Sequence, residues 1–244
     1  MKWSVKPLGI GLLTLALIAI GSAVIHRSFV LHRDAQPSGA IGPFLQQPTP
    51  EAVTVRWRSD TPEPSQVAYR ALDETEWTLA GSGEASQDHA VRLSGLRPNT
   101  RYDYRLSGPD SQDRQASFDT PPPVDDPGPH RIWILGDPGV NNPATHAVRD
   151  SSLTWMAANP HRDGDHAWPD FILTSGDNAY PSGRDRDYRD CIFTTYANVL
   201  PFIPIWPAHG NHDARRDAYR RIFDLPVDGE SGGEASGSEF YWAF

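Results

Sequence analysis

The sequence predicts an α+β multidomain protein, in which an N-terminal antiparallel β-sandwich is followed by part of an α/β domain. Three observations lead to this fold class. Short segments of alternating apolar and polar residues recur from about residue 44 to residue 120. A proline-rich segment then occupies residues 121–129. Beyond it, apolar runs alternate with segments of helical periodicity, as is typical of a largely parallel sheet.

The composition is that of a globular protein, with 38% hydrophobic and 22% charged residues among 244. Its 23 prolines and 20 glycines indicate many loops. The formal net charge is −9 and the sequence contains no basic stripe, so we expect no nucleic-acid partner. Cys191 is the single cysteine, which excludes an intrachain disulfide framework and a CxxC redox site.

The first 33 residues are predicted to be a signal peptide or a membrane anchor. Residues 8–25 carry no charge and follow Lys2 and Lys6. This apolar run is short for a bilayer span and long for the core of a signal peptide, so cleavage and retention both stay open. We expect export to the periplasm or the extracellular space, with membrane contact only through this segment.

The region 40–120 is predicted to form the sandwich domain. Its expected strands are 53–57, 67–70, 77–79, 90–93 and 102–106, separated by turns at 61–64, 81–83, 97–99 and 107–110. The segment 93–104 resembles the corner of a fibronectin type III domain, where a tyrosine closes the turn before a strand. The prolines of the linker 121–129 end this strand pattern.

The region 130–244 is predicted to be the α/β part. Its expected elements are strands at 131–135, 171–174 and 202–206, a helix at 143–159, and a helical apolar face between residues 188 and 199. A glycine and then a polar residue follow each strand, as Gly136-Asp137, Gly176-Asp177 and Gly210-Asn211. The carboxyl ends of parallel strands share one edge of a sheet, where ligands bind. We therefore expect these polar side chains to meet.

The residues that would meet are hard ligands. Asp137, Asp177, Tyr180 and Asn211 offer carboxylate, phenol and amide oxygens, which suit Fe, Mn or Mg, or Zn with a histidine. The sequence thus predicts a metal site at the carboxyl edge of the sheet.

The segments 176–183 and 210–213 are similar to motifs of the purple acid phosphatases, a branch of the calcineurin-like metallophosphoesterases. The preceding fibronectin III-like domain matches the usual partner domain, so the resemblance covers about residues 40–244. Related phosphoesterases have a histidine ligand where this chain has Gly139. Tyr180 instead is the mark of the purple acid branch.

The resemblance implies a site with two metal ions, commonly Fe(III) together with Fe, Zn or Mn. Asp137 and Tyr180 would bind the first ion, Asp177 would bridge both, and Asn211 would bind the second. A metal-bound hydroxide would then attack a phosphate monoester. His212 would protonate the leaving group, and Asp213 would orient His212 or support the site.

One departure from the family pattern qualifies this expectation. The resemblance implies three further histidine ligands beyond the Asn-His turn, and the chain ends at Phe244 before supplying them. His209 is a weak substitute candidate. We therefore expect a fragment of a longer enzyme, and whether this fragment is active alone stays open. The alternatives are a non-catalytic exported binding module with a vestigial phosphoesterase domain, and a phosphodiesterase.

Overall fold

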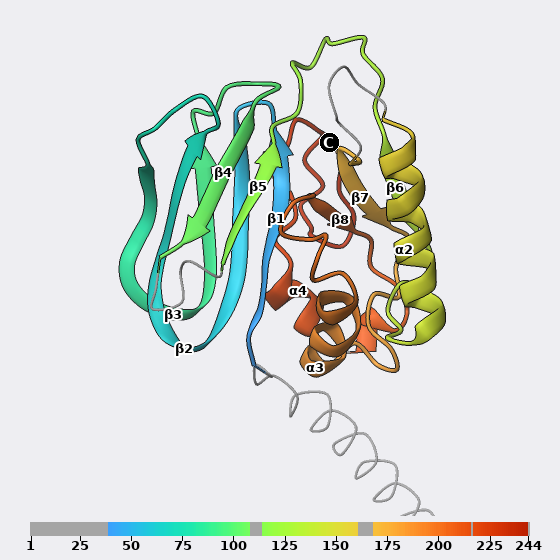
Figure 1. Cartoon of the computed structure of the whole chain (residues 1–244). Helices are drawn as coiled ribbons and strands as arrows, with labels where there is room; N and C mark the ends of the chain where they lie inside the picture. Colours follow the sequence, from blue (N-terminus) through green and yellow to red (C-terminus); the bar gives the residue numbers. More distant parts are fainter. Residues whose placement is uncertain (1–38, 108–113, 161–167, 216, 244) are drawn as a thin grey trace, which may run out of the picture.

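The computed structural model describes residues 39–107, 114–160, 168–215 and 217–243 (Figure 1). The predicted signal peptide or anchor at 1–33 lies outside these residues. No helix in the described part of the chain is long and apolar enough to cross a membrane.

The N-terminal part is an antiparallel β-sandwich. Its five strands are β1 (Ile41–Thr49), β2 (Ala52–Ala71), β3 (Thr78–Ser94), β4 (Arg101–Leu106) and β5 (Gln115–Asp119). The first half of β2 pairs with β1 and with the end of β3, whereas its second half pairs with β4 and with the start of β3. Trp57 from the first half and Tyr104 from β4 lie in one buried cluster. The sheet thus folds over itself into two layers.

The strand boundaries correct two predicted turns. Residues 61–64 and 81–83 lie within β2 and β3, where Glu63 pairs with Ser86 and Gly81 pairs with Gln66. The register of the β2–β3 pair shifts between Arg58 and Glu63. The proline and glycine residues therefore bend the two long strands at bulges, and do not end them. The sequence pattern did not predict the flanking strands β1 and β5.

The C-terminal part contains a parallel sheet of three strands in the order β6-β7-β8. Its elements are β6 (Ile132–Leu135), α2 (Pro143–Ala158), β7 (Phe171–Thr174), α3 (Asp185–Tyr188), a π-helical turn (Arg189–Phe193), β8 (Ile205–Pro207), a 3-10 turn (Asp213–Arg215) and α4 (Ala218–Ile222). The side chain of Asn142 caps α2 by accepting a hydrogen bond from the Thr145 backbone. These elements follow the order predicted from the apolar runs.

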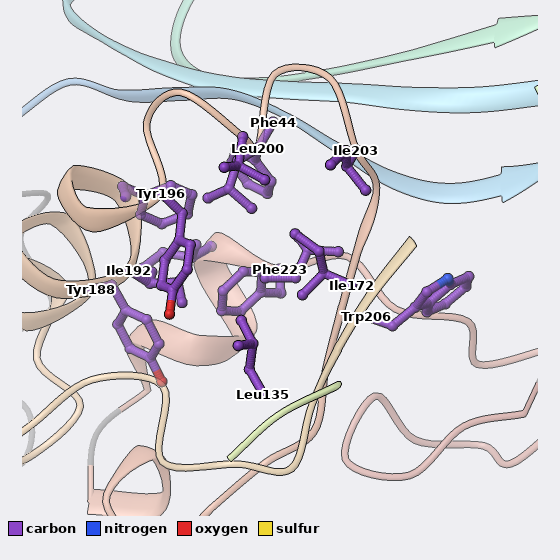
Figure 2. Packing of buried hydrophobic residues seen from close by; sticks show 14 of the residues in the cluster. Phe44, Leu135, Ile172, Tyr188, Ile192, Tyr196, Leu200, Ile203, Trp206 and Phe223 are labelled. Atoms are coloured by element: carbon purple, nitrogen blue, oxygen red, sulfur yellow. The ribbon is translucent and has the colours of Figure 1, made fainter. Parts of the chain in front are cut away.

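The predicted helical face packs into the core of the parallel-sheet part. Tyr188, Ile192, Tyr196 and Val199 are buried there, as the spacing of the apolar residues predicts. Figure 2 shows Phe44 of β1 among the side chains of this core. Its ring lies 4.9 Å from that of Phe193, so the first strand of the sandwich helps to build the core beneath the parallel sheet.

A buried ion pair also joins the two parts, which lie side by side in Figure 1. The Arg58 guanidinium on β2 contacts the Asp185 carboxylate on α3 at 2.8 Å, and both side chains are only 2% exposed. The Tyr104 hydroxyl on β4 donates a hydrogen bond to the Pro201 carbonyl at 2.8 Å. These contacts hold the parallel sheet in a fixed position against the sandwich.

Candidate functional site

The candidate site lies at the carboxyl edge of the parallel sheet, where the loops after β6, β7 and β8 begin. Asp137 follows β6, Asp177 follows β7 and Asn211 follows β8. Asp137 has a φ of 47° and Asp177 a φ of 55°, in the left-handed region that side chains other than glycine seldom adopt. Such strain persists only where the surroundings enforce it, and it is concentrated at functional sites.

The Tyr180 hydroxyl brings the two aspartates together. It lies 3.1 Å from Asp137 Oδ1 and 3.1 Å from Asp177 Oδ2, so one phenol oxygen bridges two carboxylates. Desolvation of the phenol, together with its hydrogen bonds to the two carboxylates, raises the pKa of Tyr180 to about 12. Three of the four predicted metal ligands therefore converge.

Close backbone packing places the third loop beside Asp177. The His212 backbone N–H donates to Asp177 Oδ1 at 2.8 Å. A Cβ atom on Gly210 would lie 2.1 Å from the Asp177 nitrogen, and one on Gly176 would lie 2.8 Å from the Gly210 Cα. Only glycine allows the two loops to approach this closely. Asn211 is exposed and lies between Gly210 and His212, so it shares this turn.

The His212 imidazole is oriented by the loop after β7. Its Nδ1 lies 2.7 Å from the Pro181 carbonyl oxygen, and its ring centroid lies 4.3 Å from that of Tyr180. Because a carbonyl can only accept, the hydrogen-bond network assigns a proton to Nδ1. In the neutral imidazole, Nε2 is then the basic nitrogen. The sequence predicted that Asp213 would orient His212 or support the site. In the structure, the contact that orients the imidazole is made by the Pro181 carbonyl.

Asp213 is a buried support of the site. Its carboxylate is fully buried and accepts hydrogen bonds from the Asn178 backbone and side chain, the Gly210 backbone and the Tyr188 hydroxyl. The Tyr188 contact is 2.5 Å long. Burial, and then the negative charge of Asp213, raise the pKa of Tyr188 well above its usual value. This arrangement fixes the loops after β7 and β8 to each other.

The sequence did not predict the supporting roles of two of these residues, Asn178 and Tyr188. Asn178 follows Asp177 directly, and its side chain also donates to the Ala208 carbonyl at 2.8 Å and accepts from Thr174. The only signal for it was its place in the Gly-Asp-Asn run. Tyr188 was expected only as part of an apolar helix face.

His209, the weak candidate for a substitute metal ligand, contacts two aromatic rings. Its centroid lies 4.8 Å from those of both Tyr219 and Phe240. Burial lowers the pKa of this imidazole, which favours its neutral form. The structure therefore places His209 in an apolar contact.

The oxygen atoms that converge here suit a hard cation better than they suit zinc, which is bound by sites rich in histidine. Among the described residues, no three His, Cys, Asp or Glu side chains are arranged to hold a metal ion. The group that does converge contains two carboxylates and one phenol, all oxygen donors. Iron, manganese and magnesium prefer such ligands, so the residues present fit the predicted kind of metal.

Comparisons with known proteins identify the sandwich. The sequence model of the purple acid phosphatase N-terminal domain matches residues 43–120. Purple acid phosphatases 15 and 23 of Arabidopsis thaliana are each 29% identical over 64% of this chain. The match covers 32% of the first relative and 38% of the second, so the chain spans about a third of their length.

Solved structures are also similar to parts of the chain. The structure of PhoD covers 78% of this chain and 46% of its own, with 14% identity and a TM-score of 0.49. The third fibronectin III domain of a human protein covers 39% of this chain and 90% of its own, with 13% identity and a TM-score of 0.25. The matched sequence segment coincides with the five strands described above, and the chain therefore carries an N-terminal domain of the purple acid phosphatase type.

Proposed function

We propose that this chain contributes to a metal-dependent phosphoric ester hydrolase of the acid phosphatase type, which acts on phosphate monoesters. The observation that carries this proposal is the Tyr180 hydroxyl, which bridges Asp137 and Asp177 at the carboxyl edge of the sheet. The similarity to purple acid phosphatases supports the same activity.

The site residues would divide two cations between them. Asp137 and Tyr180 would hold the first ion, Fe(III), and Asn211 would hold the second, which is Fe, Zn or Mn. Asp177 would serve both, because one of its oxygens faces Tyr180 and the other faces the His212 backbone. When bound, two such ions neutralise the phosphate oxygens and activate the attacking water.

The proton on Tyr180 is part of this chemistry. It is shared with two carboxylates, and the phenol keeps it at neutral pH because its pKa is raised to about 12. The phenol must release this proton to become a strong anionic ligand, so metal binding and proton release are coupled here.

His212 is the proposed general acid. The Pro181 carbonyl holds its Nδ1 and the Tyr180 ring lies against its face, which together fix the direction of Nε2. A protonated Nε2 would donate to the leaving oxygen of the ester. Asp213 would keep the loop of His212 in place, since its oxygens accept hydrogen bonds from Asn178, Gly210 and Tyr188.

Hydrolysis of a chromogenic phosphomonoester by the metal-loaded full chain tests the proposal. Asp177→Asn should lower the rate by about 100-fold or more, since loss of outer supporting groups alone costs about 10–100-fold at metal sites. Asp190→Asn is the matched control, because the Asp190 side chain is exposed and, within the described residues, pairs with its neighbour Arg189. Equal rates for Asp177→Asn and Asp190→Asn, or a wild-type chain that cleaves no ester, would contradict the proposal. A chromogenic diester in parallel separates phosphodiesterase activity.

A further inference from the structure

An arginine lies beside His212 and shares its hydrogen-bond acceptor. Arg215 is exposed and ends the 3-10 turn Asp213–Arg215. Its Nη1 donates to the Pro181 carbonyl oxygen at 3.1 Å, the same oxygen that accepts from His212 Nδ1 at 2.7 Å. The guanidinium and the imidazole are therefore next to each other at the rim of the site.

The Arg215 charge has no partner of opposite sign in the described part of the chain. Other arginines of this acidic protein do have one, for example Arg58 with Asp185 and Arg101 with Asp119. Arg215 donates one of its guanidinium N–H groups to a carbonyl, and its remaining N–H groups are left to bind another acceptor. A guanidinium stays charged at every accessible pH, and its fork matches the oxygens of a phosphate or carboxylate.

The position of Arg215 sets it apart from the proposed metal ligands. The Tyr180 hydroxyl touches the carboxylates of Asp137 and Asp177, whereas Arg215 contacts the backbone just beyond Tyr180, at Pro181. Arg215 thus contacts the loop after β7 at a backbone carbonyl and not at the carboxylate cluster, and its neighbour there is the general acid His212.

We propose that Arg215 binds a second anionic group of the substrate, so that the site prefers phosphate esters whose leaving group carries another phosphate or carboxylate. This inference rests on the proposed function. Arg215 is then a specificity-determining residue next to the general acid, which delivers its proton to the same leaving group.

The kinetic test compares propyl phosphate with propane-1,3-diyl bisphosphate, which differ only in the second anion. We expect Arg215→Gln to raise the ratio of the bisphosphate KM to the propyl phosphate KM about five- to tenfold, the effect of an exposed charge-assisted pair. Arg186→Gln is the matched control, because Arg186 is also exposed and, among the described residues, makes a 3.8 Å contact with Asp187. An unchanged ratio in Arg215→Gln, or an equal change in Arg186→Gln, would overturn the inference.

A binding measurement separates this inference from the proposed function. Titration calorimetry with methylenebisphosphonate on the metal-free full chain needs no hydrolysis. We expect its affinity to fall about five- to tenfold in Arg215→Gln and to remain at the wild-type value in Arg186→Gln. Equal affinities for wild type and Arg215→Gln would overturn the role of Arg215. Binding that depends on Arg215 in a chain that hydrolyses no ester would leave the anion site standing and remove the phosphatase.

Discussion

The carboxylate of Asp213 accepts hydrogen bonds from both the backbone and the side-chain nitrogen of Asn178, at 3.2 and 3.0 Å. Both residues are fully buried. Asn178 belongs to the loop after β7 and Asp213 to the loop after β8, so this pair fixes the relative position of the loops that carry Asp177 and His212.

Loss of the Asp213 carboxylate should destabilise the protein strongly. Asp213→Ala leaves the buried donors of Asn178, Gly210 and Tyr188 without their acceptor. We expect a loss of about 3–5 kcal/mol in the free energy of unfolding, because each buried donor left without an acceptor costs about 1–3 kcal/mol. Urea unfolding followed by tryptophan fluorescence measures it. The control Asp190→Ala should stay within about 0.5 kcal/mol of wild type, as exposed positions do. An equally small change for Asp213→Ala would show that its hydrogen bonds are not stabilising.

The glycine contact between the loops should be sensitive to a single methyl group. Gly210→Ala would place a Cβ 2.1 Å from the Asp177 nitrogen, so the loops must move apart. We expect a loss of about 1–3 kcal/mol in the free energy of unfolding, the usual cost of overpacking. Gly83→Ala is the control, since its Cβ would meet nothing closer than 3.9 Å. Equal stabilities for the two variants in urea would mean that the loops do not pack as described.

The Arg58–Asp185 pair should couple the sandwich to the parallel sheet. Asp185→Leu leaves the buried Arg58 guanidinium with Asp88 alone and should cost about 3–5 kcal/mol. The double variant Arg58→Met/Asp185→Leu should recover much of this loss, because it removes both charges. A double-mutant cycle in urea measures the interaction, and additive single changes would show that the pair is not coupled.

His89 should make stability depend on pH. Ser59 donates its hydroxyl proton to the Thr61 carbonyl, so it accepts from His89 Nε2 at 2.9 Å, and Nδ1 lies 2.9 Å from the Ser65 hydroxyl. Burial is the main cause that lowers the pKa of His89 below its model-compound value of 6.5. The unfolded chain therefore binds this proton more readily than the folded chain.

The lowered pKa of His89 makes the folded protein less stable at low pH. The stability that comes from neutral His89 is fully present above pH 6.5 and is lost as pH falls through that value toward the lower pKa of the folded state. Urea midpoints at pH 7.5, 6.5 and 5.5 should decline in the wild type and decline less in His89→Gln. Parallel declines in the two proteins would exclude His89 as the titrating group.

Patterns within single segments predicted much of this fold. The glycine turns and apolar runs located β6, β7 and β8, and the sequence pattern of residues 143–159 located α2. The two layers of the sandwich followed from alternation, but its long strands did not. Pro62 and Gly83 look like turn residues in isolation, and only pairing across the sheet shows that they lie at shifts of the β2–β3 register.

The site was predictable to the extent that strand ends determine it. Asp137, Asp177 and Tyr180 converge because parallel strands share an edge. The acceptor role of Asp213 and the position of Arg215 depend on how two loops approach each other in space. No spacing along the chain encodes that approach, so these roles emerged only from the structure.

Metal binding by the full chain tests the central claim most directly, which is that Asp137, Asp177 and Tyr180 form one site for a hard cation. The measurement is metal content after equilibrium dialysis against Fe(III) and Zn(II), for wild type, Asp177→Asn, Tyr180→Phe and the control Asp190→Asn. We expect bound metal in the wild type and in Asp190→Asn, and more than about tenfold weaker binding in the other two variants. Equal metal content in all four proteins, or none in any of them, would contradict the claim.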